Sequence, residues 1–214
     1  MIQVNENHPI YHKLIKIVSE KNVALQKPLK EYTYTRLGGR ADFFVTPETY
    51  EQVQEIIRLA QNEIVEFTLL GNGSNLIIRD GGIRGIVLNL GKLDAVKVAG
   101  DQLIAQSGAR IIHASQVALR HRLTGLEFAC GIPGSVGGAL FMNAGAYGGE
   151  IKDVLESTLV VDRAGNMKRL LAEDLDLEYR SSNIPENGYI VLEATFTLAP
   201  GDERKIKATI HLKK

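Results

Sequence analysis

The sequence of 214 residues predicts an α+β fold built around a small sheet. Two observations indicate this class. Short apolar blocks typical of strands occur at Ala41–Val45, Ile64–Leu70 and Ile83–Leu90. Between the first two blocks, apolar residues repeat at helical spacing, at Val53, Ile56, Ile57 and Ala60. Strands interrupted by a helix in this order are typical of an α+β protein.

The N-terminal third contains two predicted helix starts. Apolar residues at helical spacing predict a first helix over Ile10–Leu29, which Pro28 brings to its end. The run Thr46-Pro47-Glu48 predicts the start of the second helix, with a capping hydroxyl, a proline and an acid in the first turn. The chain continues as a strand to Leu70, a glycine loop, and an extended run at Leu76–Ile78.

The second half of the chain alternates short strands with one longer helix. We expect the helix over Arg110–Leu123 and a hairpin turn at Asp162–Asn166. The expected strands are Ala95–Val98, Leu103–Gln106, Leu155–Val161, Met167–Leu171 and Tyr189–Leu198. We therefore divide the chain into an N-terminal helix or tail (residues 1–30), two subdomains (31–94 and 95–200) and the start of a further region (201–214).

The composition excludes several classes of function. Hydrophobic residues make up 44% and charged residues 23%, close to globular averages. The 25 basic and 25 acidic residues cancel, so no global field attracts nucleic acid or an anionic membrane. The single cysteine, Cys130, excludes an intrachain disulfide and a CxxC metal site. Without a signal peptide or an apolar stretch of ~20 residues, the sequence predicts a cytoplasmic protein that binds no metal, membrane or nucleic acid.

The first chemistry-bearing segment is the loop Leu70-Gly71-Asn72-Gly73-Ser74-Asn75. Its glycines allow a close approach of the backbone to a ligand, and successive N–H groups in such a turn bind anions. The Rossmann fingerprint needs a third glycine and a following helix, and neither is present here. Taken alone, the loop is a weak signal, because a plain Gly-Asn-Gly turn is the alternative interpretation.

The second segment, Gly131–Gly149, holds 7 of the 21 glycines. Gly137 and Gly138 would let the backbone pass flat against a bulky group, and Asn143 and Tyr147 supply polar contacts. A glycine-rich crossover for tight packing is the alternative interpretation. Two such loops in one small protein, both with serine and asparagine, favour a large cofactor that carries phosphate.

Other residues give weaker indications. Arg180, after Tyr179, can stabilise an enolate or a carboxylate because its guanidinium stays charged, although a lone arginine more often forms a surface salt bridge. A buried thiol is the favoured interpretation of Cys130. Glu127 fits a hydrogen-bonded structural carboxylate as well as a partly buried acid, and the histidines show no metal-binding spacing.

Six motifs in order resemble the UDP-N-acetylenolpyruvoylglucosamine reductases, flavoenzymes of bacterial peptidoglycan precursor synthesis. They are Thr35–Asp42, Leu70–Asn75, Gly125–Glu127, Gly131–Gly138, Asn143–Gly148 and Tyr179–Ser182. The resemblance covers roughly residues 30–200 and implies a two-subdomain FAD-binding domain of the vanillyl-alcohol oxidase type. It also implies FAD and NADPH as cofactors and the enolpyruvate of a UDP-sugar as substrate.

The resemblance carries over to individual residues. It implies that Arg180 stabilises the enolate intermediate and that Tyr179 and Arg180 bind substrate. The residues that it assigns to FAD are Leu70, Gly71, Asn72, Gly73, Ser74, Asn75, Gly131, Ile132, Pro133, Gly134, Ser135, Gly137, Gly138, Asn143, Ala146 and Tyr147.

The sequence departs from the family at its C-terminal side. The family's substrate domain, with its proton-donating serine and a late glutamate, has no counterpart in these residues. We therefore expect the chain alone to bind FAD weakly or not at all and to lack reductase activity. The alternatives are another flavin oxidoreductase of the vanillyl-alcohol oxidase type and a non-catalytic binding module.

Overall fold

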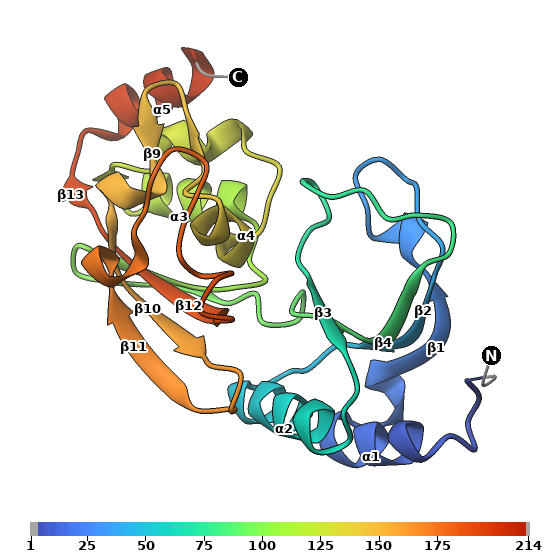
Figure 1. Cartoon of the computed structure of the whole chain (residues 1–214). Helices are drawn as coiled ribbons and strands as arrows, with labels where there is room; N and C mark the ends of the chain where they lie inside the picture. The colour runs from blue at the N-terminus through green and yellow to red at the C-terminus, as the bar shows by residue number, and fades with distance from the viewer. Residues whose placement is uncertain (1–3, 213–214) are drawn as a thin grey trace. The chain divides into compact units, whose positions relative to one another are not determined.

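The computed structural model describes residues 4–212 and divides them into two compact units. The first unit contains the described residues up to Leu93 together with Arg163–Asn166, and the second contains the others (Figure 1). Residues 1–30, which the sequence analysis separated, belong to the first unit as far as they are described. The predicted region 201–214 is described up to Leu212, and residues 1–3 and 213–214 lie outside the described part.

The first unit is built on a four-stranded sheet with the strand order β1-β2-β4-β3. Strand β1 is antiparallel to β2, whereas β2 and β3 both run parallel to β4. Helices α1 and α2 pack against each other beside this sheet (Figure 1). The elements are α1 (Pro9–Val18), β1 (Val23–Pro28), β2 (Arg40–Val45), α2 (Tyr50–Asn62), β3 (Phe67–Leu70) and β4 (Ile83–Asn89), with 3₁₀ turns at Glu20–Asn22 and Leu29–Glu31.

The helix predicted over Ile10–Leu29 is wrong in its second half. Helix α1 ends at Val18, and Ser19 reverses the chain with a φ of 68°. The following residues form β1, in which Val23 lies opposite Val45 of β2. This pairing joins residues far apart in sequence, so local apolar spacing does not reveal it.

The second helix is confirmed, but its predicted start is wrong. Thr49, not Thr46, caps α2, and its hydroxyl accepts a hydrogen bond of 3.3 Å from the Gln52 amide. The apolar face of α2 is buried as predicted, at Val53, Ile56, Ile57 and Ala60. Fully buried valine and isoleucine side chains each contribute roughly 1.5–3 kcal/mol, and the methyl group of an alanine contributes less.

The second unit is built on a five-stranded antiparallel sheet with the order β11-β10-β12-β6-β5. The predicted strands Leu155–Val161 (β10) and Met167–Leu171 (β11) are confirmed to the residue. The other three strands differ from their predicted ends by one residue; they are β5 (Val96–Ala99), β6 (Gln102–Gln106) and β12 (Ile190–Thr197).

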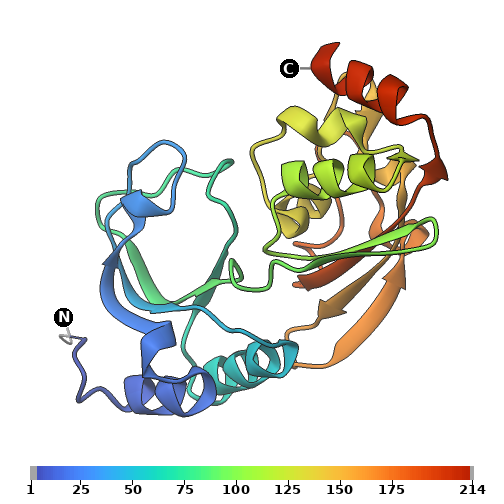
Figure 2. The same ribbon diagram turned by 180° about the vertical axis from the view of Figure 1, so that it is seen from behind.

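Helices α3 (Ile111–Arg120) and α4 (Val136–Phe141) cover one face of this sheet, and α5 (Glu203–Leu212) packs against α3 (Figure 2). Apolar side chains of β6 and β12, with Phe196 fully buried, form one core with both covering helices. Two short pairs complete the unit: β7 (Leu123–Thr124) with β13 (Ala199–Pro200), and β8 (Gly145–Ala146) with β9 (Gly149–Glu150). Further 3₁₀ turns lie at Glu127–Gly131, Ile151–Asp153 and Ala172–Leu175.

Within residues 4–212, none of the helices combines the length and the apolar character that crossing a membrane requires.

Candidate functional site

The first glycine loop leaves the end of β3 in the first unit. As predicted, no helix follows it, and Leu76–Ile78 continues outside any strand. Gly73 has a φ of +63°, and a Cβ at this position would lie 2.0 Å from the Tyr32 carbonyl oxygen. The Tyr34 amide donates to the Gly73 carbonyl at 2.9 Å, which fixes the loop against its neighbour. Gly73 is therefore required by the fold itself, through its backbone conformation and this close approach.

The amide groups of this loop are free. Among the hydrogen bonds of residues 4–212, none is donated by a backbone N–H of Gly71–Asn75 or by the side chains of Asn72, Ser74 and Asn75. Five consecutive unpaired N–H donors on an exposed turn suit an anion. The N–H groups of the loop can thus donate hydrogen bonds to a pyrophosphate, although the loop carries no formal charge.

A buried asparagine that the sequence analysis missed supports this loop. Asn89, at the end of β4, donates from Nδ2 to the carbonyls of Leu70 and Gly71 at 2.9 and 3.3 Å. Leu70 is itself buried in the core of the first unit, so its side chain serves packing. The available signal was a polar residue that ends an otherwise apolar strand.

The second glycine segment is more regular than predicted, because it contains α4, β8 and β9. Ser135 caps α4, and its hydroxyl accepts from the Gly138 amide at 3.3 Å. A Cβ on Gly137 would lie 2.1 Å from Ser107 Oγ, and the Gly137 amide donates to the Ser107 carbonyl. The alternative interpretation of tight packing therefore accounts for Gly137, and its predicted contact with the cofactor stays a prediction. Gly138 is exposed.

The segment before α4 stays at the surface of the second unit. Gly131 and Pro133 are exposed, and Ile132 and Gly134 are half-buried. The Gly134 carbonyl accepts a hydrogen bond of 3.0 Å from the Ile111 amide, which ties the segment to the start of α3. These four residues remain candidates for cofactor contact.

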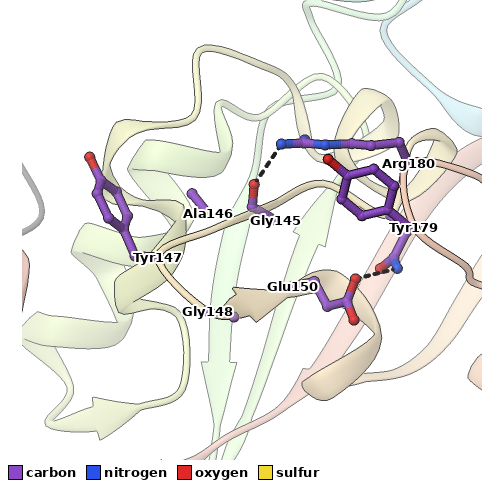
Figure 3. A pocket seen from close by; sticks show the side chains of 9 residues that line it. Gly145, Ala146, Tyr147, Gly148, Glu150, Tyr179 and Arg180 are labelled. Carbon is purple, nitrogen blue, oxygen red and sulfur yellow. Dashed lines mark hydrogen bonds between the residues drawn. The ribbon is translucent and has the colours of Figure 1, made fainter.

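A pocket of about 310 Å³ brings together residues that the sequence predicted at separate places. Tyr147 lies toward one end of it, and Tyr179 and Arg180 lie toward the other (Figure 3). The β8–β9 hairpin forms the wall between them. The lining residues are Asn143, Gly145, Ala146, Tyr147, Gly148, Gly149, Glu150, Tyr179 and Arg180.

Arg180 stands at the tip of a tight turn. The turn is closed by two backbone hydrogen bonds between Glu178 and Ser181, of 3.2 and 3.1 Å. Arg180 Nη2 donates to the Gly145 carbonyl at 3.0 Å, and the guanidinium lies 5.9 Å from the centre of the Tyr179 ring (Figure 3). No ion pair between described residues includes Arg180, so its charge is available to a ligand.

Three residues other than glycine that line this pocket have a positive φ: Asn143 (40°), Tyr147 (54°) and Arg180 (56°). Such conformations cost of order 1–3 kcal/mol each and persist where the surrounding structure enforces them. Six further described residues with a positive φ lie outside the pocket, so backbone strain by itself does not single the pocket out.

A carboxylate in the pocket wall was also missed by the sequence analysis. Glu150 Oε1 accepts from Lys152 Nζ at 2.8 Å, and Oε2 accepts from Asn143 Nδ2 at 2.8 Å. The hydrogen bond to Glu150, and then its negative charge, raise the pKa of Lys152. Lys152 therefore offsets the charge of Glu150 beside Arg180.

Asn143 is held by partners inside the protein, and its predicted contact with the cofactor stays a prediction. It is 1% exposed, and both of its amide atoms have partners inside the protein. The weaker candidates are also accounted for: Glu127 accepts hydrogen bonds from Thr124 and Gly125, and Cys130 is buried as expected. The described residues form no cluster of metal-ligating side chains.

The comparisons with known proteins agree with this geometry. A family model described as FAD binding domain matches residues 41–171. The UDP-N-acetylenolpyruvoylglucosamine reductase of Oceanobacillus iheyensis is 62% identical over 94% of this chain and 66% of its own length. The enzyme of the same name from Staphylococcus aureus (strain COL) is 52% identical over the same shares. The chain thus spans 66% of the length of these relatives.

Solved structures show the same fold. The crystal structure of UDP-N-acetylenolpyruvylglucosamine reductase from Thermus caldophilus has a TM-score of 0.76 and 32% identity, covering 89% of this chain and 66% of that one. A p-cresol methylhydroxylase structure, 15% identical, has a TM-score of 0.63 and covers 89% of this chain and 42% of its own. These likenesses confirm the predicted fold class. The chain therefore belongs to the FAD-binding domain family and, within it, to the UDP-N-acetylenolpyruvoylglucosamine reductases, whose FAD-binding portion it represents.

Proposed function

We propose that this chain binds FAD and forms the flavin part of an enzyme that uses NADPH to reduce the enolpyruvate of UDP-N-acetylglucosamine to UDP-N-acetylmuramate. The observation that carries the proposal is the run of unpaired N–H donors at Gly71–Asn75. A pyrophosphate needs several convergent donors, and a backbone turn supplies them without formal charge. The relatives' name and the FAD-binding family support the identity of the cofactor and the substrate.

In this proposal, the first loop holds the phosphates of FAD. Further cofactor contacts come from the surface of the second unit, at Gly131–Gly134, Gly138, Ala146 and Tyr147. When bound, FAD would supply the redox chemistry, namely hydride transfer between NADPH and the enolpyruvyl double bond. The chain's own residues bind, orient and stabilise charge.

Arg180 is the proposed catalytic residue, with Tyr179 beside it for substrate binding. Hydride addition to an enolpyruvyl group places negative charge on the neighbouring carboxylate system, and a fixed guanidinium stabilises that charge. Arg180 is suited to this role because it is oriented by Gly145 and has no ionic partner among the described residues. A lysine would keep the charge but lose the planar fork of donors.

We place this reaction in the cytoplasm, in peptidoglycan precursor synthesis. The substrate is a small nucleotide sugar, so the proposal needs no metal, membrane or nucleic acid as partner. For the chain by itself we propose weak FAD binding, and the lack of turnover expected of it stays a prediction.

FAD binding is tested by following the backbone amide signals of Gly71–Asn75 in NMR titrations. FAD is expected to shift these signals, because its pyrophosphate accepts from the free N–H groups. Riboflavin, which has the same ring system without phosphates, is expected to leave them unchanged. The proposal is wrong if millimolar FAD leaves these signals in place, or if riboflavin shifts them to the same extent.

A further inference from the structure

The turn that carries Arg180 needs support from its base, because its tip is open to solvent. Tyr179 and Arg180 are both exposed, and Tyr179 is 84% exposed. The two bonds between Glu178 and Ser181 close the turn on itself but do not attach it to the rest of the unit. The position of the guanidinium therefore depends on what holds the two ends of the turn.

Two buried polar side chains hold these ends. After the turn, Ser182 is 5% exposed, and its hydroxyl donates to the Phe141 carbonyl at 2.8 Å. At the first residue of the turn, the Glu178 carbonyl accepts a hydrogen bond of 3.0 Å from Asn143 Nδ2. Both contacts fix the turn to the end of α4 and the residues that follow it.

Asn143 connects the turn to the hairpin that forms the pocket wall. Nδ2 has two hydrogens, and the second is donated to Glu150 Oε2 at 2.8 Å. Oδ1 accepts from the Lys152 amide at 2.9 Å. Only one orientation of the Asn143 amide satisfies all three partners. If the amide were turned round, its oxygen would face the two acceptor oxygens and its NH₂ group would face the Lys152 N–H. Asn143 thus has no freedom left with which to contact a ligand.

We propose that Asn143 is the positioning residue of Arg180. By holding the Glu178 carbonyl against the β8–β9 hairpin, it sets the distance over which Arg180 Nη2 reaches the Gly145 carbonyl in the same hairpin. Asn143 and Arg180 thus connect the turn and the hairpin at two points. The functional importance of this arrangement rests on the proposed role of Arg180.

The test is Asn143→Asp, with Asn183→Asp as a matched control. Asn183 lies two residues after the turn, and its Nδ2 likewise donates to one carbonyl and one carboxylate, Asp174 O at 2.8 Å and Asp176 Oδ2 at 2.9 Å. Both substitutions keep the shape of the side chain and replace the same two donors by a carboxylate oxygen. Only Asn143→Asp removes the hydrogen bond to the Glu178 carbonyl, whereas Asn183→Asp leaves that bond in place.

Two readouts follow the turn and do not require turnover. The first is amide hydrogen exchange at Glu178 and Ser181, and the second is the rate at which phenylglyoxal modifies Arg180. Asn143→Asp is expected to raise both by about tenfold, since one buried hydrogen bond is lost. Asn183→Asp is expected to leave both within about twofold of the unchanged protein.

A further variant separates positioning from general loss of structure. Asn143→Asp places a carboxylate against Glu150, so we include the double variant Asn143→Asp with Glu150→Gln, whose new amide can donate to the aspartate. If the repulsion between the new carboxylate and Glu150 in Asn143→Asp also speeds exchange of the β10 and β12 amides, the double variant is expected to reverse that general effect, while exchange at Ser181 stays fast.

Three results overturn the proposal: an unchanged turn in Asn143→Asp, an equal effect of Asn183→Asp, or recovery of the turn in the double variant. The proposed role of Arg180 fails on a different observation, namely reduction of the UDP-sugar at an unchanged rate when Arg180→Gln is introduced into the whole enzyme of which this chain is proposed to form the flavin part.

Discussion

Gly73 shows how a single residue connects the fold to the candidate cofactor site. Its φ of +63° disfavours any side chain, and the Tyr32 carbonyl occupies the place of a Cβ. The same residue accepts the Tyr34 amide, so the loop Gly71–Asn75 is held without using its own N–H groups. Packing therefore uses a carbonyl group of this short segment and leaves its N–H groups for the proposed ligand.

Gly73→Ala is expected to destabilise the first unit by more than about 2 kcal/mol, since the strained φ adds roughly 1–2 kcal/mol to the cost of moving the Tyr32 backbone. Urea unfolding measures the loss. Gly81→Ala is the control, because nothing lies within 4 Å of its Cβ position and its φ is not positive. Equal stability of the two variants would contradict the close approach at Gly73.

At the level of elements, the strands were the features that the sequence predicted best. Strands β10 and β11 matched to the residue, and the turn residues Asp162–Asn166 that separate them mark the end of one strand and the start of the next. Strand β1 was missed because its only sheet partner, β2, is fixed by a pairing with residues some 20 positions away. The apolar spacing typical of a helix continues up to Val23, but the helix itself ends before Ser19, whose φ is positive.

Helix α4 was missed for a different reason. Its sequence contains Gly137 and Gly138, and glycine costs a helix interior roughly 1 kcal/mol relative to alanine. The tertiary contact with Ser107 repays this cost, because only a residue without Cβ lets α4 approach so closely. Only part of the candidate site could be predicted. The sequence motifs identified Tyr147, Tyr179 and Arg180, whereas Asn89 and Glu150 are recognised only from their contacts in the structure.

Glu156 on β10 joins three strands of the second sheet and gives it a dependence on pH. Its carboxylate accepts hydrogen bonds from Thr197 Oγ1 on β12 and from Gln102 Nε2 on β6. The bond from Thr197, and then that from Gln102, hold the pKa of Glu156 below its ordinary value of 4.5. A lowered pKa means that the carboxylate stabilises the folded state above pH 4.5, and that this contribution is lost as the pH falls through the folded-state pKa.

Glu156→Gln is expected to remove that part of the acid sensitivity. In urea unfolding between pH 7 and pH 3, the variant should lose less free energy of unfolding than the unchanged protein below about pH 4.5. Parallel pH curves for the two proteins would show that Glu156 contributes nothing that depends on its ionisation.

On the scale of the whole molecule, each unit has an apolar core of its own. Phe196 is fully buried in the core of the second unit, and Ile86 is fully buried in the first. The family resemblance implied a domain of two parts, and the structure divides into two compact units after Leu93, with Arg163–Asn166 assigned to the first. Separate cores imply that local openings in one unit need not expose the amides of the other.

Phe196→Leu is therefore expected to speed amide exchange in β10 and β12, and Ile86→Val to speed it in β2 and β4. Each change removes buried volume, with a cost of the order of 0.5–1.5 kcal/mol for the isoleucine. Mass spectrometry of exchanged peptides gives the pattern. If either substitution raised exchange to the same degree throughout residues 4–212, the molecule would open as one cooperative unit instead.

The bond between Arg180 and Gly145 also bears on how the molecule recognises an anion. A guanidinium carries five N–H donors, and Gly145 occupies one of them on Nη2. A carboxylate can therefore be received by a remaining edge without displacing the internal partner. Because the side chain is already oriented, less rotational freedom is left to lose on association, and more of the interaction is retained as affinity.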